Sequence, residues 1–353
     1  MKNKNIYFVT GGCGFIGSAL IRNLLRSKDN LVINIDKLSY ASNVLAIEAA
    51  ESDSYIFIKD DILNKNKINE ILLEYSPNYV IHLAAESHVD RSIDNPSSFI
   101  QSNIVGTFNL LNECYSYWRK LEGATKESFR FLLISTDEVY GSTLKEPFSE
   151  SSPLKPNSPY AASKASADLL ARSWYKTFNF PILITNCSNN YGKWQYPEKL
   201  IPLVIKKCLQ NEKIPIYGNG KQERDWIHVD DHVDGLLTVL LKGSLGQKYN
   251  IATAKEKTNL EVVIEICSIM DILKPNDLNN YSNLISFVED RPGHDYRYSM
   301  AINKITNELN WYPSISFSEG IKETVIWYLN NQDWLFDPDK ISYDGKRLGQ
   351  NLK

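Results

Sequence analysis

Short β-branched runs alternate with amphipathic helical segments through the first half of the chain, and this alternation constrains the fold more than any other feature. The predicted strands are residues 6–10, 31–36, 55–59, 79–83, 130–135 and 182–187. Apolar residues recur at three-to-four spacing between most of them, which predicts helices at 15–25, 65–74, 96–117 and 160–178. This alternation is typical of an α/β fold built on a doubly wound parallel sheet.

The pattern changes after about Asn189. Prolines and glycines divide residues 197–220 into short pieces, and a further helix is predicted at 260–273. We therefore expect a first domain at residues 1–188, rejoined by about 225–252. A smaller C-terminal lobe would be formed mainly by residues 189–353.

Composition excludes several classes of protein. The 353 residues carry 39 Lys+Arg and 42 Asp+Glu, a formal charge of −3, so the chain has no basic field for nucleic acid. The five cysteines are scattered without a C-x-x-C pair, which argues against a disulfide framework or a zinc cage. No apolar run approaches the roughly 18–20 residues of a membrane span. We expect a cytoplasmic protein that binds neither nucleic acid nor membrane.

The first chemical motif is TGGCGFIG at residues 10–17, where the first predicted strand meets the first helix. Gly11, Gly14 and Gly17 would permit a tight turn, close approach of a pyrophosphate and close helix packing. Asp36 follows the last glycine by 36 − 17 = 19 residues, where a carboxylate accepts hydrogen bonds from an adenosine ribose and repels a 2′-phosphate. The motif predicts a Rossmann-type NAD site. A glycine-rich turn without a ligand is the alternative, and the neighbouring Lys37 weakens the preference for NAD over NADP.

Two aspartates follow the third predicted strand. Asp61 and the adjacent Ile62 could reach the adenine of the same cofactor. Capping of the next helix by Asp60 or Asp61 explains the sequence equally well.

Tyr160 and Lys164 lie four residues apart in a predicted helix, so both side chains share one face. An ammonium beside a phenol lowers the phenol pKa, which would let Tyr160 act as a base toward an alcohol near neutral pH. The spacing is common by chance, and an ordinary surface pair is the alternative.

Thr136, Asp137 and Glu138 close another predicted strand, at the sheet edge where open α/β folds bind ligands. Two carboxyl groups in one partly dry site can have their pKa values pushed apart, so that one donates a proton and the other accepts one. Solvated loop residues are the alternative for such a pair taken alone.

Several segments together resemble the nucleotide-sugar branch of the extended short-chain dehydrogenases. They are TGGCGFIG at 10–17, HLAAESHVDRS at 82–92, STDEVYG at 135–141 and YAASK at 160–164. Further segments resemble, more narrowly, the dTDP-glucose 4,6-dehydratases. These are NCSNNYG at 186–192, PEKLIP at 197–202, RDW at 224–226 and DRPGHD at 290–295. The resemblance covers residues 5 to about 335.

The resemblance implies conversion of dTDP-glucose to dTDP-4-keto-6-deoxyglucose, a step in the synthesis of deoxysugars such as dTDP-rhamnose. It implies a tightly bound NAD that each turnover regenerates. Tyr160, assisted by Lys164 and Thr136, would take the 4-hydroxyl proton during oxidation at C4. Glu138 would then remove the C5 proton and Asp137 would protonate the departing 6-hydroxyl.

The same resemblance implies the binding residues. Those beside NAD would include Phe15 and Ile16 of the glycine motif together with Asp61, Ile62, Leu83, Ala84, Ala85 and Ser102. Those beside the nucleotide sugar would be Ser87, Asn190, Glu198, Lys199, Leu200, Tyr217, Arg224, Asn259, Arg291 and His294. A homodimer would form through the helices at 96–117 and 160–178.

The sequence departs from the family at Lys193 and Trp194, where proline is usual, and at Ser102, where threonine is common. His82, His88 and His232 lack metal-ligand spacing, so no metal site is expected. Two other functions stay open. One is a related dehydratase or epimerase acting on a UDP-, CDP- or GDP-sugar, and the other is an NAD-binding protein without turnover.

Overall fold

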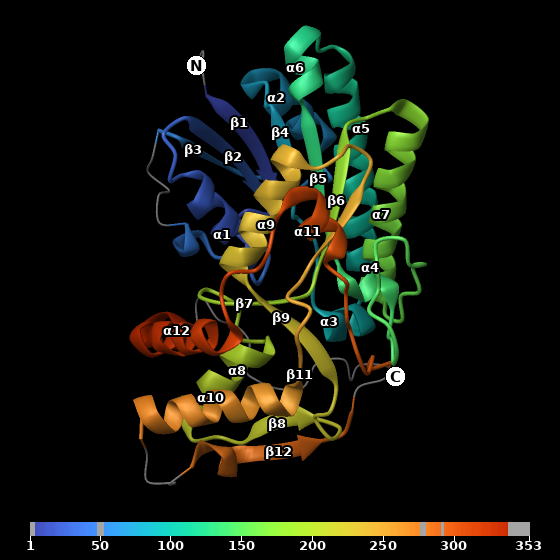
Figure 1. The fold of residues 1–353 in the computed structure, drawn as a ribbon. Coiled ribbons are helices and arrows are strands. Elements are labelled where there is room, and N and C mark those ends of the chain that lie inside the picture. The colour runs from blue at the N-terminus through green and yellow to red at the C-terminus, as the bar shows by residue number, and fades with distance from the viewer. Residues whose placement is uncertain (1–3, 48–52, 276–279, 291–292, 338–353) are drawn as a thin grey trace.

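A seven-stranded parallel sheet forms the centre of the upper lobe in Figure 1. The computed structural model describes residues 4–47, 53–275, 280–290 and 293–337. The strand order is β3-β2-β1-β4-β5-β6-β10, so the order reverses between β1 and β4. Its strands are β1 (Asn5–Thr10), β2 (Asn30–Asp36), β3 (Tyr55–Lys59), β4 (Tyr79–His82), β5 (Arg130–Thr136), β6 (Ile182–Cys187) and β10 (Lys248–Ile251).

Helices cover both faces of this sheet because its strands are apolar on both sides. On β1, Tyr7 and Val9 face one core cluster whereas Ile6 and Phe8 face the other. One face is covered by α1 (Phe15–Leu24), α9 (Val229–Lys242) and α11 (Asn303–Leu309). The other is covered by α2 (Lys65–Tyr75), α5 (Thr107–Arg119) and α7 (Pro159–Phe178). The predicted α/β class with a Rossmann-type doubly wound sheet is confirmed.

The lower lobe has two small sheets and its own apolar core. Its strands are β7 (Asn189–Tyr191), β8 (Ile214–Tyr217), β9 (Glu223–His228), β11 (Glu256–Thr258) and β12 (Ile285–Val288). Its helices are α8 (Leu200–Gln210), α10 (Asn259–Leu273), η4 (Tyr281–Leu284), α12 (Phe317–Asn330) and α13 (Gln332–Phe336). A capping box between Thr258 and Glu261 starts α10. Asp225 lies in β9 of the three-stranded sheet, whereas α9 and β10 belong to the upper lobe.

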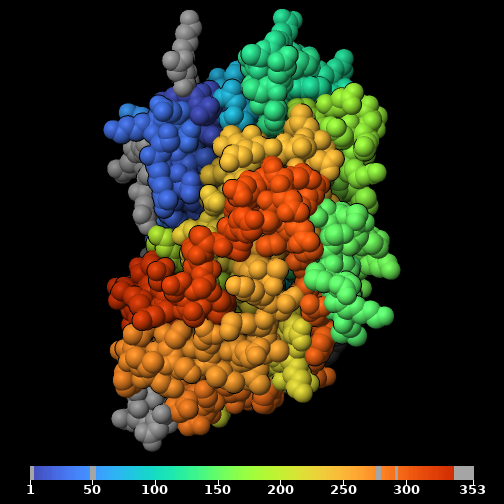
Figure 2. Space-filling view, in the orientation of Figure 1, coloured from blue at the N-terminus to red at the C-terminus, as the bar shows by residue number. Residues whose placement is uncertain are grey.

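The C-terminal part of the chain lies against both lobes. The orange and red surface in Figure 2 runs from the lower lobe over the upper one and back. Ile305 and Leu309 of α11 pack into the core of the upper lobe, and Val325 and Tyr328 of α12 pack into that of the lower lobe. The lobes are thus joined by several chain crossings.

The predicted helix at 96–117 is present as one uninterrupted helical run, α4 (Pro96–Phe99), a π-helix η2 (Ile100–Gly106) and α5, and what the sequence did not show is the π geometry of its middle part. A separate short helix, α3 (Val89–Asp94), precedes it. The wider π turn buries Asn103. Its Oδ1 accepts from the backbone N of Glu86, and its Nδ2 donates to the backbone O of Glu86 and, at 2.9 Å, to Ser163 Oγ. Three short helical elements were not predicted from the sequence, namely η1 (Val44–Ala46), α6 (Gly123–Ser128) and η3 (Asp137–Tyr140).

Among the described residues, no helix combines the length and the apolarity needed to cross a membrane.

Candidate active site

A pocket lies at the carboxyl ends of the main-sheet strands, on the side of the lower lobe. Most residues proposed from the sequence line it. They are Gly11, Gly14, Phe15, Ile16, Gly17, Asp36, Lys37, Asp61, Ile62, Leu83, Ala84, Ala85, Ser87, Ser102, Thr136, Glu138, Tyr160, Lys164, Asn190, Glu198 and Lys199. Parallel strands and the loops after them therefore bring these distant motifs to one place.

The glycine turn exposes its backbone to the close approach of a ligand and leaves little room for a side chain on its own residues. Gly11 has φ +73°, and a Cβ there would lie 2.6 Å from the backbone of Ala84. A Cβ on Gly17 would lie 2.3 Å from the carbonyl oxygen of Gly11. The turn leads into α1, which has no acidic residue in its first turn, so its N-terminus suits a pyrophosphate.

The Gly11→Ala variant is expected to lose most of its bound NAD, because the new methyl collides with backbone. The measurement is the NAD released per chain on denaturation. Gly123→Ala is the matched control, since Gly123 also has positive φ but a Cβ there would meet nothing within 4 Å. That control should cost about 1 kcal/mol of stability from backbone strain and keep its NAD. Full NAD content in Gly11→Ala would contradict the assignment of the turn.

Asp36 is buried at the end of β2 and holds two loops. Its Oδ2 accepts from the backbone N of Cys13 at 2.9 Å, and its Oδ1 accepts from Leu38 N at 2.8 Å and Ser42 Oγ at 3.0 Å. Burial raises the pKa of this carboxyl while the backbone hydrogen bonds oppose that rise. The residue is thus fixed at the pocket edge where an adenosine ribose would lie.

Lys37 is paired with carboxylates. Its Nζ lies 3.0 Å from Glu86 and 3.9 Å from Asp61. These carboxylates offset the charge of Lys37, so Lys37 attracts the 2′-phosphate of NADP less than the sequence alone suggested. Neither aspartate of the Asp60–Asp61 pair caps α2, because Asn64 is the N-cap and accepts from Lys67 N.

Tyr160 and Lys164 are both buried on one face of α7. Ser158 caps this helix by accepting from Ala161 N, and Pro159 occupies its first position. Lys164 Nζ donates to the carbonyl oxygen of Ile134 at 2.7 Å, which fixes it against β5. This geometry places the phenol and the ammonium together in the pocket.

The predicted lowering of the Tyr160 pKa is wrong. Burial and the nearby Glu138 carboxylate raise the pKa of Tyr160 well above its usual value. Burial also lowers the pKa of Lys164, an effect that Asp168 opposes. Sequence spacing shows that two groups share a face but not how dry that face is.

The acid pair lies on η3, directly after β5. Thr136 caps this turn, accepting from Glu138 N and donating to Asp137 Oδ1 at 3.1 Å. Burial and then Glu138 raise the pKa of Asp137 to about 8. Within the described part of the chain, Asp137 Oδ2 is buried and has no hydrogen-bond partner. Glu138 is part of the pocket lining and Asp137 is not, and a pKa of about 8 favours the protonated form of Asp137 at neutral pH.

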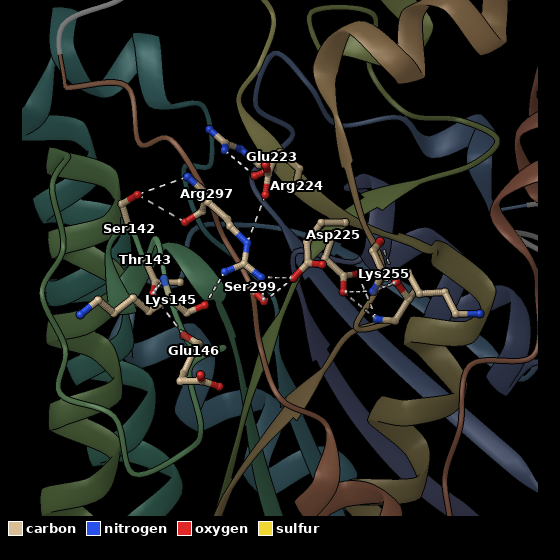
Figure 3. A network of polar contacts seen from close by, with 12 residues as sticks. Ser142, Thr143, Lys145, Glu146, Glu223, Arg224, Asp225, Lys255, Arg297 and Ser299 are labelled. Carbon is tan, nitrogen blue, oxygen red and sulfur yellow. Dashed lines mark hydrogen bonds and ion pairs between the residues drawn. The ribbon is translucent and has the colours of Figure 1, made fainter.

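A polar network fixes the loop after this turn to the lower lobe (Figure 3). Thr143 N donates to the carbonyl oxygen of Arg297, whose guanidinium donates to Lys145 O at 2.7 Å. The same guanidinium pairs with Glu223 at 3.2 Å and Glu256 at 3.0 Å. The segment that continues from Asp137 and Glu138 is thus tied to β9 and β11.

Arg224 lies outside the pocket lining. Its guanidinium donates to the carbonyl oxygens of Glu223, Asp295 and Tyr296 and lies 4.2 Å from the ring centre of Tyr298. Arg224 thus organises the segment around Asp295 and is not part of the pocket lining. A diphosphate role for Arg224 stays a prediction.

Glu198 joins two rims of the pocket. Its Oε1 accepts from Tyr40 OH at 2.7 Å, and its Oε2 pairs with Arg91 Nε at 3.0 Å. The guanidinium of Arg91 also lies 3.7 Å from the ring centre of Tyr40. Beside them, Lys199 Nζ donates to the carbonyl oxygen of Ser87 at 3.2 Å. The loop after β2 is thereby held to the loop before α8.

Four more of the proposed substrate residues, Leu200, Tyr217, Asn259 and His294, are described by the structure but are not part of this pocket lining. Leu200 and Asn259 are the first residues of α8 and α10. Tyr217 and His294 are neighbours, with ring centres 6.4 Å apart. Arg291 lies outside the described residues.

The histidines have polar partners of their own. His82 is buried between the hydroxyls of Thr10 and Thr107, and burial lowers its pKa to about 3. His232 Nδ1 lies 2.8 Å from Asn190 Oδ1. In the ranges that the structure describes, no three His, Cys, Asp or Glu side chains gather in a way that could hold a metal ion.

Sequence reasoning missed part of the lining. The unassigned residues include Ser39, Ala41, Ser42, Cys187, Ser188, Asn189, Gln195 and Tyr196. Cys187 ends the predicted strand β6, so its position at the carboxyl end of the sheet was the available signal. At the departure Lys193–Trp194, Trp194 adopts φ 71°, and its ring lies 4.6 Å from that of Trp327 between centres.

Comparison with known proteins decides the family. The family model described as GDP-mannose 4,6 dehydratase matches residues 8–324. A dTDP-glucose 4,6-dehydratase of Haemophilus influenzae is 52% identical over 329 residues, 92% of this chain and 97% of that protein. The chain belongs to the dTDP-glucose 4,6-dehydratase family. The resemblance inferred from the sequence motifs is therefore confirmed.

Solved structures agree with membership of the dTDP-glucose 4,6-dehydratase family. DesIV, a dTDP-glucose 4,6-dehydratase from Streptomyces venezuelae crystallised with NAD, has a TM-score of 0.84 at 39% identity, covering 93% of this chain and 98% of DesIV. A UDP-glucose 4-epimerase from Thermotoga maritima has a TM-score of 0.81 at 26% identity, covering 93% and 99%. Because the epimerase shares the fold, side chains of the site must distinguish the two reactions.

Proposed function

We propose that this protein is an NAD-dependent dTDP-glucose 4,6-dehydratase, a hydro-lyase that forms dTDP-4-keto-6-deoxyglucose. The observation that carries the proposal is the acid pair on η3, in which Glu138 lines the pocket together with Tyr160 while burial raises the pKa of the adjacent Asp137 to about 8. An epimerase needs no second acid to expel water. The nearly full-length similarity to dTDP-glucose 4,6-dehydratases supports the same reaction and nucleotide.

The glycine turn, the N-terminus of α1 and Asp36 fit NAD, and NAD is the cofactor in the related crystal structures. When bound, NAD accepts hydride from C4 of the sugar and later returns it to C6. The chain's own task in the first step is to remove the 4-hydroxyl proton. Tyr160 could accept that proton only as the phenolate, and Lys164 is the neighbouring cation that favours its ionisation against the effect of burial. The Thr136 hydroxyl would bond to the same oxygen.

The second step is loss of water across C5 and C6. A ketone at C4 acidifies the C5 proton, which Glu138 would remove from its position on the pocket wall. The electron pair of that C–H bond forms the C5–C6 double bond as the C6–O bond breaks. Asp137 would supply the proton that converts the departing hydroxyl to water. When hydride adds at C6, Glu138 would return a proton to C5, and exchange of that proton with solvent is what would place deuterium there in D₂O. The different environments of the two carboxyls suit these opposite roles.

Mass spectrometry of dTDP-glucose incubated with the protein in D₂O tests this function, with UDP-glucose in parallel. Loss of one water with deuterium at C5 of the product is the expected result. Water loss from UDP-glucose alone would favour the alternative of a dehydratase for another nucleotide, which the description of the family model keeps relevant. Saturable NAD binding with no reaction of either sugar would favour a binding protein without turnover.

The pKa of Asp137 predicts a pH limit for the elimination step. The carboxyl donates a proton only while protonated, so elimination should slow as the pH rises through about 8. Single-turnover measurement should then show reduced cofactor accumulating above that pH, because oxidation at C4 continues. Elimination at a constant rate to pH 10 would contradict this role for Asp137.

A homodimer is part of the proposal. Ile100, Phe108, Leu169 and Phe178 are exposed apolar residues of η2, α5 and α7, and Leu169 is 56% exposed. Two copies related by a two-fold axis would bury such a surface against itself. The homodimer and a cytoplasmic location remain expectations, the latter supported by five free cysteines.

Leu169→Glu is expected to reduce the mass in solution to that of a monomer, because it places charge in the apolar surface. Light scattering at a fixed protein concentration measures this. Leu241→Glu, at a similarly exposed position on α9, is the control and should leave the mass unchanged. A monomeric wild-type protein would refute the dimer.

A further inference from the structure

A buried polar network lies beneath the catalytic segments and has no part in the steps above. Asp168 is its centre, on α7 four residues after Lys164 and eight after Tyr160. These spacings place the three side chains along one face of the helix. Asp168 is 2% exposed and does not line the pocket.

One amide links Asp168 to the strand end that carries the acid pair. Asn186 Nδ2 donates to Asp168 Oδ2 at 3.2 Å and to the carbonyl oxygen of Thr136 at 3.0 Å. On the η3 side, Tyr140 OH donates to Asn250 Oδ1 at 2.9 Å and lies 3.4 Å from Asn186 Oδ1. Asn186 therefore holds α7, which carries Tyr160 and Lys164, against the end of β5.

Asp168 also offsets the cost of burying the Lys164 cation. Burial lowers the pKa of Lys164, and the Asp168 carboxylate is the first opposing cause. A second cation, Lys248 of β10, lies 3.5 Å from the same carboxylate. The ammonium of Lys164 therefore shares its counter-charge with Lys248.

Several titratable groups that face Lys164 and Asp168 keep one protonation state near neutral pH. His82 of β4 is neutral because burial lowers its pKa to about 3. Burial raises the pKa of the Cys187 thiol of β6 to about 12, and it raises the pKa of Tyr140 on η3 well above its usual value. Burial likewise raises the pKa of Tyr160 on α7. Asp137 on η3, with a pKa of about 8, is the neighbouring group that changes charge between pH 6 and 9, whereas Asp168 and Lys248 are the charged pair nearest to Lys164 on α7 and β10.

We propose that Asp168 is a positioning residue for oxidation at C4, keeping the Lys164 ammonium charged and, through Asn186, holding α7 against the strand end that carries Thr136. The proposal deepens the proposed function and rests on it for the reaction step. Its electrostatic part concerns Lys164 itself and is measurable in the protein without substrate.

The test is the titration of Lys164 by carbon NMR of protein labelled at lysine Cε, the signal being assigned by its loss in Lys164→Met. Asp168→Asn keeps the size of the side chain and an acceptor for Asn186 but removes the charge. The titration midpoint of Lys164 should fall by about one pH unit or more. The alkaline limb of the single-turnover rate of C4 oxidation should fall with it, and Asp168→Glu should restore both.

Two further variants separate this role from a general effect on folding. Asp231→Asn is the matched control, because Asp231 is a buried carboxylate that accepts from Ser314 and Ile315, which do not line the pocket. It should lower Tm and leave Lys164 unshifted. Lys248→Met removes the competing cation from a less buried position and should raise the midpoint, which keeps the test valid if Asp168→Asn does not fold.

A Lys164 midpoint that stays within about 0.2 pH units of wild type in both Asp168→Asn and Lys248→Met would overturn the proposal. If the Lys164 midpoint shifts in the variants as expected but the wild-type protein does not convert dTDP-glucose, the result would count against the proposed function alone. The NMR and turnover measurements thus fail independently.

Discussion

Replacing Asp137 by Asn and Glu138 by Gln together should stop water loss from dTDP-glucose while C4 oxidation continues. Both amides keep the size of the side chains, but neither donates nor accepts the required proton. Loss of acid and base should each slow elimination by about 10²-fold or more. Reduced cofactor should then accumulate with the 4-ketone, detected by absorbance and by product mass.

The single variants provide the controls for this experiment. Asn at 137 can still accept the hydrogen bond that Thr136 donates to Asp137 Oδ1, so η3 should keep its cap. Tm and NAD content of both single variants should therefore remain near wild type. Dehydration at the wild-type rate in the double variant would remove the acid pair from the mechanism.

Tyr160→Phe should abolish the earlier step, oxidation at C4. The ring keeps its edge contact with Phe99, at 6.2 Å between centres, but the proton acceptor is lost. A decrease of about 10²- to 10⁴-fold is expected in the rate at which reduced cofactor forms after mixing with dTDP-glucose. NAD content should stay at the wild-type level.

Tyr249→Phe is the matched control for that loss. Tyr249 is also buried, and its hydroxyl donates to Glu308 at 2.8 Å between β10 and α11. Removing this hydroxyl should cost stability of about 1 kcal/mol without changing the oxidation rate. Wild-type oxidation by Tyr160→Phe would show that another group takes the 4-hydroxyl proton.

The parts of the site that could be predicted are those set by local spacing. Gly11 to Gly17 lie in one turn, Tyr160 and Lys164 share one helical face, and Asp137 and Glu138 are adjacent. Each group follows a strand or begins a helix whose periodicity is plain in the sequence. The strand positions themselves agreed with the structure to within a residue at each end.

Contacts between distant segments could not be predicted in this way. Tyr40 and Arg91 reach Glu198 across 158 and 107 residues of sequence. The π turn of η2 also depends on such contacts, because Asn103 forms hydrogen bonds with the backbone of Glu86 and with the hydroxyl of Ser163 on α7. Burial is equally hidden from sequence, and this is why the direction of the Tyr160 pKa was wrong.

The repeated crossings of the chain between lobes have a further consequence for how such a protein can change. A fragment ending at residue 188 would lack α9, β10 and α11, leaving one face of the main sheet covered by α1 alone. The lower lobe likewise has no continuous sequence of its own. Neither lobe can therefore be exchanged with that of another protein by joining two genes end to end.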